Sequence, residues 1–185
     1  MRKIPTLFVR DPDTWFVTDE VTPGCEWVLA GEGTPTVKFD GTCTMFDGDA
    51  WWARREVKPG RDVPDGFVEV EADPVTGKLF GWVPIESSPF VKFWREAFQC
   101  RPMFEVEYVP GTYELCGPKI NGDPERFLGM HRLVRHGVMP TVGGTPVELI
   151  AACRRAGSEG VVWHHPDGRM VKLKVRDFPV EGAAS

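Results

Sequence analysis

The 185-residue sequence has no long apolar segment. A helix that crosses a membrane needs roughly 18 or more consecutive apolar residues, and no run approaches that length. The opening residues, Met1-Arg2-Lys3-Ile4-Pro5, are not followed by the apolar core of a secretory signal. We therefore expect a cytoplasmic protein with no membrane partner.

Cysteine is scarce and poorly spaced for a structural role. The five cysteines are far apart in the sequence and form no C-x-x-C pair; they are Cys25, Cys43, Cys100, Cys116 and Cys153. This arrangement argues against a disulfide framework and against a zinc site. His164 and His165 are adjacent but lack a third ligand at a recognisable spacing. We expect the cysteines to be reduced and mostly buried.

Positive charge is also not in excess. The chain carries 22 Lys and Arg against 27 Asp and Glu, a net charge of −5 at pH 7. This balance disfavours a protein that coats nucleic acid through its overall charge. Any nucleic-acid contact must come from a local basic surface. The composition, 42% hydrophobic and 26% charged, is typical of one globular domain.

Short β-rich runs separated by turn residues make up most of the chain. The expected strands cover 6–9, 26–30, 66–72, 78–85, 103–109 and 112–117. Asp47-Gly48 between two such runs predicts a hairpin, and Pro166-Asp167-Gly168 predicts a second one near the C-terminus.

Three helices are expected between these strands. Ser88-Pro89 opens a helix over 88–98, whose stripe of Phe90, Phe93 and Trp94 indicates a core face rather than a base-stacking surface. A short helix is expected over 123–130. The third helix, 145–156, starts with a capping box of Thr145 and Glu148 and ends at Gly157.

The last predicted hairpin gathers charge. Lys172, Lys174 and Arg176 share one strand face by the two-residue period, opposite Glu159-Gly160 on the partner strand. A solvated edge strand that discourages aggregation explains this pattern. A site for a metal-bound polyphosphate explains it as well.

The stretch 36–42 contains the candidate nucleophile, Lys38. It reads as a strand that presents one amine and then turns sharply at Asp40-Gly41. The alternative is an ordinary hairpin turn with a solvated lysine before it. A free lysine has a pKa of about 10.4, so its amine must lose a proton before it attacks. Cations within a few ångströms of the amine would favour that loss.

The order of several short motifs resembles a known superfamily. The motifs are K-x-D-G at 38–41, Arg55 after the first hairpin, Glu114-Leu115-Cys116-Gly117, Glu159-Gly160-Val161-Val162 and Lys172-x-Lys174. In this order they resemble the covalent nucleotidyltransferases, namely ATP-dependent RNA ligases, DNA ligases and mRNA capping enzymes. The resemblance implies that Lys38 attacks the α-phosphate of ATP and becomes a lysyl-AMP.

The resemblance also implies a role for each motif. Arg55, with Arg54 as the competing assignment, would contact the ribose and the incoming 5′ end, and Glu114 would bind the ribose hydroxyls. Glu159 would lie near Mg²⁺ or Mn²⁺, while Lys172 and Lys174 would hold the α-phosphate and the leaving pyrophosphate. The implied nucleotide-binding set is Val37, Lys38, Asp40, Gly41, Arg54, Arg55, Glu114, Glu159, Lys172 and Lys174. For the aromatic residue that stacks on the base, Phe127 and His131 are the candidates.

The implied fold is α+β, with two mainly antiparallel sheets flanked by helices and the nucleotide between them. We expect one adenylation domain over 1–185 without the C-terminal OB-fold domain of DNA ligases and capping enzymes. Such a minimal form is most similar to ATP-dependent RNA ligases, which join the 5′-phosphate and 3′-OH ends of nicked or broken RNA. A partner protein is a further expected source of RNA binding. The alternatives are a DNA nick ligase, a capping-type transferase, and a non-catalytic nucleotide- or RNA-binding module.

Overall fold

The computed structural model describes residues 3–100, 107–124, 126, 129–141 and 143–179. These residues form two compact units, each built from separate stretches of the chain. Of the described residues, those of Lys3 and Asp40–His136 form the six-stranded unit, and those of Ile4–Phe39 and 137–179 form the three-stranded unit. All pairings between the named strands are antiparallel, and helices are few, which confirms the expected mixed architecture.

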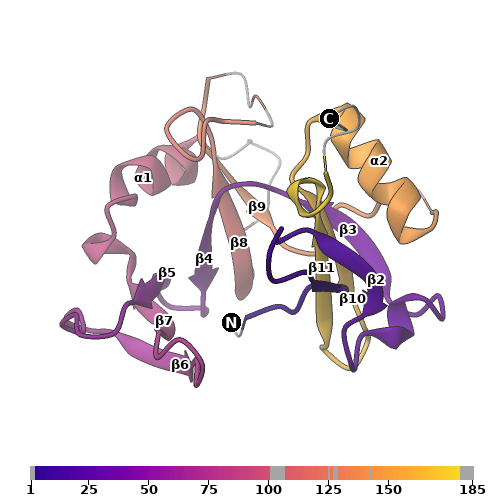
Figure 1. Ribbon diagram of the computed structural model, residues 1–185. Helices are drawn as coiled ribbons and strands as arrows, with labels where there is room; N and C mark the ends of the chain where they lie inside the picture. The colour runs from indigo at the N-terminus through magenta and orange to yellow at the C-terminus, as the bar shows by residue number, and fades with distance from the viewer. Residues whose placement is uncertain (1–2, 101–106, 125, 127–128, 142, 180–185) are drawn as a thin grey trace. The chain divides into compact units, whose positions relative to one another are not determined.

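The six-stranded unit is one sheet with the strand order β6-β7-β5-β4-β8-β9 (Figure 1). Its strands are β4 (Thr42–Phe46), β5 (Trp51–Val57), β6 (Val68–Ala72), β7 (Leu79–Pro84), β8 (Gly111–Cys116) and β9 (Arg132–Arg135). Asp47-Gly48 joins β4 to β5 as the predicted hairpin, in which Thr44 pairs with Ala53. The expected strand over 103–109 lies partly outside the described residues, since 101–106 are not described.

Helix α1 (Val91–Gln99) covers one face of this sheet. It follows the 3₁₀ turn η2 (Ile85–Ser87), and the hydroxyl of Ser88 accepts a hydrogen bond from the Phe90 N–H at 3.2 Å. Ala97 packs with Leu115 and Ile120, joined by the aromatic residues of the predicted stripe. The stripe is therefore core, as expected from its helical spacing.

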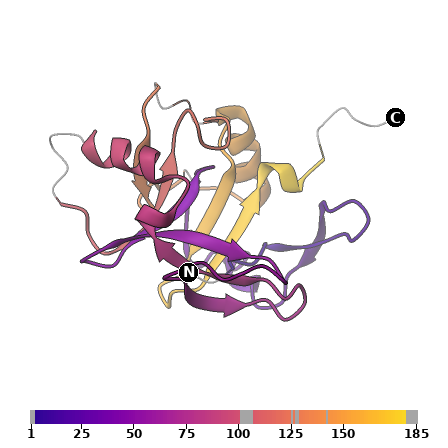
Figure 2. The ribbon, with the colours of Figure 1, turned by 90° about the vertical axis from the view of Figure 1, so that its left-hand side faces the viewer.

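The three-stranded unit is built on the sheet β11-β10-β3, with a separate two-stranded ribbon of β1 and β2. The strands are β1 (Phe8–Arg10), β2 (Val17–Val21), β3 (Thr34–Lys38), β10 (Gly160–His164) and β11 (Met170–Lys174). The described residues thus form three sheets where two were expected. Helix α2 (Pro146–Ala156) runs beside β10 and β11 in both views (Figures 1 and 2).

Helix α2 begins and ends where the sequence predicts. The Thr145 hydroxyl accepts from the Glu148 N–H, and the Glu148 carboxylate accepts from the Thr145 N–H, which completes the capping box. Gly157 ends the helix in the left-handed conformation, at φ 74°. Leu149, Ile150 and Cys153 pack on the buried side of the sheet.

Three expectations about local structure are wrong. The segment 26–30 is not a strand: Glu26–Val28 forms the 3₁₀ turn η1, because the Glu26 carboxylate accepts from the Gly24 N–H and tightens the chain. The described residues of 123–130 are not helical, since Asp123 and Arg126 both have positive φ. Arg176 belongs to the 3₁₀ turn η3 (Val175–Asp177) rather than to the strand of Lys172 and Lys174.

The alternative reading of Asp40-Gly41 as a hairpin turn is also wrong. β3 pairs with β10, whereas β4 pairs with β5 and β8, so the strands before and after Asp40-Gly41 belong to different sheets. The K-x-D-G stretch is the point at which the chain passes from one unit to the other. Among the helices of the described residues, none has the length and apolar character needed to cross a membrane.

Candidate active site

Three strands bring Lys38, Glu159 and two further lysines together in the three-stranded unit. Gly160 of β10 pairs with Lys38 of β3 on one side and with Lys174 of β11 on the other. Lys172 lies two residues before Lys174, so it shares the same sheet face. Glu159 immediately precedes Gly160 and reaches both neighbouring strands. The predicted gathering of these four charged residues is therefore present.

Glu159 forms ion pairs with two of the lysines. Its Oε2 accepts from the Lys38 ammonium and its Oε1 accepts from the Lys174 ammonium. The Glu159 side chain is only 8% exposed. Burial alone would raise its pKa, but the charges of Lys38 and Lys174 and their hydrogen bonds outweigh burial, and the pKa of Glu159 is lowered. The carboxylate therefore stays ionised between its two partners.

Lys172 is the perturbed cation of this group. Burial, followed by repulsion from Lys174 and Lys38, lowers the pKa of Lys172 from 10.5 to about 8. Three lysines thus surround one carboxylate, and the cluster has an excess of positive charge. An anion with several oxygens, such as a phosphate chain, would relieve the repulsion among these lysines.

Gly160 makes the arrangement possible because β10 and β11 lie very close at this point. A Cβ at Gly160 would sit 2.1 Å from the Leu173 carbonyl oxygen and 2.8 Å from the Lys174 Cα, both backbone atoms. Only glycine fits such an approach. The Glu-Gly pair predicted from the sequence therefore combines a charged residue with the small residue that lets the lysine strand approach it.

Asp177 and Arg10 stabilise this end of β11, and neither was predicted. Asp177 is fully buried; its carboxylate accepts from the Lys174 N–H at 2.9 Å and from Arg10 at 2.5 Å. The ion pair holds the backbone of Lys174 in place. Arg10 and Asp177 are 167 residues apart, so no local pattern marks them as partners.

The second half of the K-x-D-G stretch is tied to β8 in the six-stranded unit. The Gly41 N–H donates to Glu114 Oε1 at 3.1 Å. The Asn121 side-chain amide donates to Asp40 Oδ1 at 2.8 Å and to the Gly41 carbonyl at 3.0 Å. A Cβ at Gly41 would lie 2.3 Å from the Leu115 carbonyl oxygen. Glycine is therefore required here by the close approach of β8, and Asn121 was missed by sequence reasoning.

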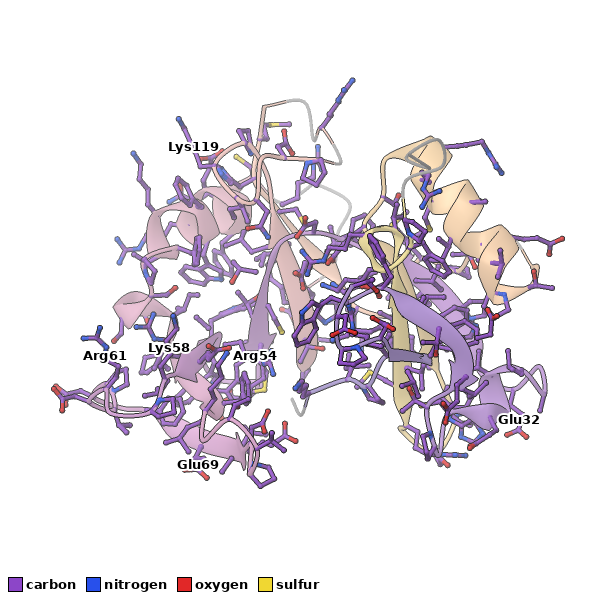
Figure 3. All side chains as sticks on the ribbon, in the orientation of Figure 1. Glu32, Arg54, Lys58, Arg61, Glu69 and Lys119 are labelled. Atoms are coloured by element: carbon purple, nitrogen blue, oxygen red, sulfur yellow. The ribbon has the colours of Figure 1, made fainter. Side chains whose placement is uncertain are left out.

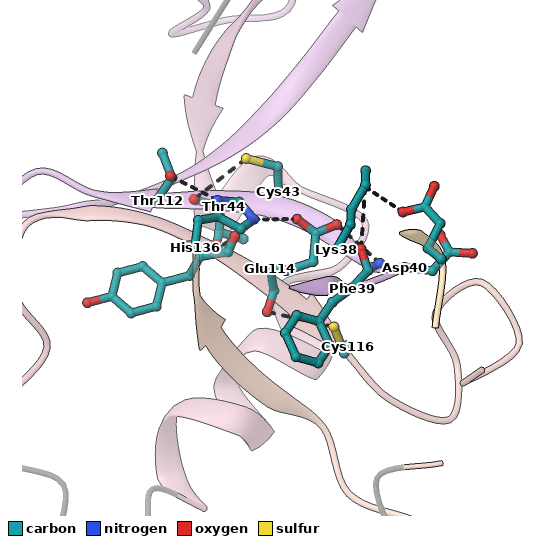
Figure 4. Close-up of polar contacts among 12 residues, drawn as sticks. Lys38, Phe39, Asp40, Cys43, Thr44, Thr112, Glu114, Cys116 and His136 are labelled. Carbon is teal, nitrogen blue, oxygen red and sulfur yellow. Dashed lines mark hydrogen bonds and ion pairs between the residues drawn. The ribbon is translucent and has the colours of Figure 1, made fainter. Parts of the chain in front are cut away.

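Glu114 has a second partner, His136, which follows β9. His136 Nε2 lies 2.8 Å from Glu114 Oε2, and Nδ1 lies 2.9 Å from the Thr112 hydroxyl (Figure 4). Both oxygens of Glu114 are thus oriented, one by Gly41 and one by His136. The sequence offered no signal for His136, because it lies 22 residues from Glu114, in the turn after β9.

Strand register separates Arg54 from Arg55. Cys43 pairs with Glu114 and Thr44 pairs with Ala53, so Arg54 shares the sheet face of Cys43 and Glu114, and Arg55 lies on the face of Ala53. Arg54 is labelled in Figure 3 and is half-buried. Its guanidinium lies 5.1 Å from the centre of the Phe80 ring. Its Nε is buried and has no hydrogen-bond partner among the residues the structure describes.

The remaining predicted residues divide as follows. Val37 lies on β3, on the face opposite Lys38, and its N–H donates to the Met139 carbonyl at 2.9 Å. His131 is wrong as a base-stacking residue, since it is 4% exposed and its ring stacks on Phe93 at 4.5 Å. Phe127, the other candidate, lies outside the described residues. Cys25, Cys116 and Cys153 are buried, as expected, and no disulfide joins cysteines among the residues that the structure describes.

The chain is similar to proteins named RNA ligase 1. The protein from Rattus norvegicus is 26% identical, over 68% of this chain and 46% of its own length. The protein from Danio rerio is 26% identical, over 66% of this chain and 45% of its own length. The chain thus spans about half the length of these relatives, and no protein-family model matches it. The similarity confirms the predicted relationship to RNA ligases.

Proposed function

We propose that the chain carries the nucleotidyltransferase activity of an ATP-dependent RNA ligase. The observation that carries the proposal is the convergence of Lys38, Lys172 and Lys174 on Glu159 in one sheet. The lysine of K-x-D-G is thereby surrounded by cations that suit a phosphate chain. The similarity to proteins named RNA ligase 1 supports RNA, rather than DNA, as the polynucleotide.

In the first step, the Lys38 ammonium loses a proton to solvent and the resulting amine attacks the α-phosphorus of ATP, giving up a second proton to solvent as the new bond forms. A phosphorus–nitrogen bond forms, the bond to the bridging oxygen breaks, and pyrophosphate leaves with the β- and γ-phosphates. Lys172 and Lys174 neutralise charge on the phosphate oxygens during this step. Phosphate contacts would replace the ion pairs of Glu159 with Lys38 and Lys174, which frees the Lys38 side chain to turn toward phosphorus.

In the later steps, AMP moves to RNA and the strand is joined. A 5′-phosphate oxygen of RNA attacks the phosphorus of lysyl-AMP, which regenerates Lys38 and forms a 5′-to-5′ diphosphate bridge. A 3′-OH then attacks the RNA phosphorus, and AMP leaves. Glu114 is proposed to bind the ribose hydroxyls. Asp40 and Gly41, in the turn after Lys38, are proposed to contact the nucleotide as well.

Of the two arginines, Arg54 is our choice for the contact to the 5′ end. It shares a sheet face with Glu114, and its buried Nε lacks a partner among the described residues. Arg55 is exposed on the opposite face. The strand register therefore favours Arg54, whereas the motif order favours Arg55.

Glu159 is the residue proposed to hold Mg²⁺ or Mn²⁺. It fits a magnesium ion because it is an ionised carboxylate next to the proposed phosphate site, and Mg²⁺ is usually bound through one or two carboxylates plus phosphates and water. When bound, the ion would neutralise charge on the phosphate oxygens. The chain's own residues supply the nucleophile and the remaining positive charge.

The test uses RNA with 5′-phosphate and 3′-OH ends, ATP and magnesium. We expect efficient joining when the strand that carries the 3′-OH is RNA. Joining should be strongly reduced when that strand is DNA. Equal joining of both would contradict an RNA ligase and favour a DNA nick ligase. Transfer of label from GTP rather than ATP would indicate a capping-type enzyme, and no transfer from either would indicate a non-catalytic binding module.

A further inference from the structure

A second group of reactive side chains belongs to the six-stranded unit. Cys43 of β4, Glu114 of β8 and His136 after β9 each offer a ligand atom, and these atoms all lie within 4.8 Å of one another. Cys43 and Glu114 are directly opposite in neighbouring strands, and the His136 N–H donates to the Thr112 carbonyl, which continues the ladder to the next strand (Figure 4). The three side chains are therefore on one face of a regular sheet.

We infer that Cys43, Glu114 and His136 form a binding site for zinc or a chemically similar divalent transition metal. One thiolate, one imidazole and one carboxylate are the ligand types zinc takes in proteins, whereas Mg²⁺ and Ca²⁺ prefer oxygen alone. Three protein ligands leave a fourth position open for water or another ligand. Such a site exchanges its metal more readily than a closed four-ligand structural site.

The residues behind these ligands support the site. The Thr112 hydroxyl lies 2.9 Å from His136 Nδ1, so it orients the ring and leaves Nε2 directed at Glu114. The Gly41 N–H donates to Glu114 Oε1, so that the other oxygen, Oε2, faces His136. Ligating histidines and carboxylates in metal sites are commonly held by such hydrogen bonds.

The hydrogen bond between His136 and Glu114 occupies the place the metal would take. Nε2 and Oε2 are 2.8 Å apart, with one proton between them. Bonds of about 2.0–2.2 Å to a tetrahedral zinc ion require a separation of about 3.4 Å, so the pair must open by roughly half an ångström. The metal replaces the proton. The Thr112 hydroxyl can accept or donate, so it accommodates the change of imidazole tautomer.

The burial of the three ligands suits a metal that enters from solvent. Glu114 is buried, while Cys43 and His136 are half-buried. The ligands are thus partly shielded from water, which strengthens metal coordination, yet the site is not sealed within the core.

The metal site would overlap the nucleotide site, a consequence that rests on the proposed function. Glu114 is the proposed contact for the ribose hydroxyls, and a carboxylate bound to zinc cannot accept from them in the same way. Zinc is therefore expected to compete with ATP. The metal site itself does not depend on this consequence.

The direct test is a Co²⁺ titration of the full chain, since Co²⁺ replaces zinc and reports thiolate ligation by a charge-transfer absorption band. One equivalent of Co²⁺ should bind and produce that absorption band. Added zinc should displace the Co²⁺ and remove the band. Cys43→Ser should abolish the band and His136→Gln should weaken Co²⁺ binding at least 10-fold. Cys100→Ser and His165→Gln, which alter a cysteine and a histidine outside the cluster, should leave binding unchanged. Absence of the band, or its persistence in Cys43→Ser, would overturn the inference.

A measurement on the unmodified chain covers the case in which a variant does not fold. Zinc should slow alkylation of Cys43 about 10-fold or more, mapped by mass spectrometry, and leave alkylation of the exposed Cys100 unchanged. Alkylation of Cys43 at the same rate with and without zinc would overturn the inference. A chain that binds Co²⁺ through Cys43 but never takes label from ATP would retain the metal site and lose only the proposed function.

Discussion

Lys38 and Glu159 form an ion pair within one sheet although 121 residues separate them in the sequence. The pair places the proposed nucleophile next to a carboxylate that stays ionised because its lysine partners lower its pKa. In the absence of a nucleotide, this carboxylate balances part of the charge of the lysine cluster. The same pairing makes Glu159 important for stability as well as for the proposed chemistry.

Replacement of Glu159 by Gln should destabilise the fold. The substitution keeps the shape but leaves Lys38, Lys172 and Lys174 with no carboxylate between them. Removing one partner from a buried ion pair costs about 3 kcal/mol, because the remaining charges stay in a poorly solvated site. Urea unfolding should show a lower midpoint with an unchanged slope. Glu20→Gln, at an exposed position of β2, should change the stability by less than about 0.5 kcal/mol. Equal stability of Glu159→Gln and the unmodified chain would contradict the ion pairs.

Lys172 should make stability depend on pH in the alkaline range. The pKa of Lys172 is about 8 in the folded chain, against 10.5 for a lysine in the unfolded chain. Between these two pH values the folded chain therefore binds fewer protons than the unfolded chain. Lys172 therefore lowers the free energy of unfolding below about pH 8. This loss of stability disappears as the pH rises from about 8 to 10.5. Lys38, Lys174, Glu159 and Asp177 all act on this group.

The comparison of Lys172→Met with the unmodified chain isolates this contribution. The variant should be more stable by about 1–3 kcal/mol at pH 7, and its advantage should shrink as the pH approaches 10. Lys92→Met on the exposed side of α1 controls for the general loss of a lysine. An advantage that stays constant from pH 7 to pH 10 would contradict the lowered pKa.

Gly41→Ala should disrupt the turn after the nucleophile. The new Cβ would meet the Leu115 carbonyl at 2.3 Å and Glu114 Cγ at 2.8 Å, so the turn and β8 must move apart. Overpacking of this kind costs about 1–3 kcal/mol. At Gly143, a Cβ meets nothing within 4 Å, so Gly143→Ala should be nearly neutral by thermal unfolding. A larger loss for Gly143→Ala than for Gly41→Ala would contradict the close approach.

The two neighbouring arginines should differ in their effect on RNA joining. Arg54→Ala should lower kcat/KM for joining by about 10- to 100-fold, as expected for loss of one charged hydrogen bond to a phosphate. Arg55→Ala should change it by less than about threefold. Both variants should unfold at similar temperatures if the effect is on the substrate. The reverse order of effects would show that strand register has identified the wrong arginine.

Local signals were sufficient to predict several elements of the fold. Thr145, Glu148 and Gly157 mark both ends of α2, because capping depends on residues within one turn of each end. Asp47-Gly48 marks its hairpin for the same reason. The segment 26–30 differs from the prediction because a short apolar run fits a strand or a helical turn equally well. In the structure, the Val28 N–H donates to the Cys25 carbonyl and the Leu29 N–H donates to the Glu26 carbonyl, which are the bonds of a 3₁₀ turn.

Longer-range relationships were predictable only where the motif order supplied them. The order of motifs brought Lys38 and Glu159 together, but nothing in either segment reports that β3 pairs with β10. His136, Asn121 and Cys43 carry no signal, since each becomes a neighbour of the K-x-D-G turn or of Glu114 only through long-range contacts: Cys43 through strand pairing, and Asn121 and His136 through side-chain hydrogen bonds. C-x-x-C spacing cannot reveal this cluster, because its ligands come from β4, from β8 and from the turn after β9.

The central claim is that Lys38 becomes covalently attached to AMP. The most direct measurement is to incubate the full chain with α-labelled ATP and magnesium and to follow label on the denatured protein. The unmodified chain should carry label that pyrophosphate removes, and Lys38→Ala should carry none, whereas the control Lys92→Ala should be labelled normally. Label retained by Lys38→Ala would contradict the account.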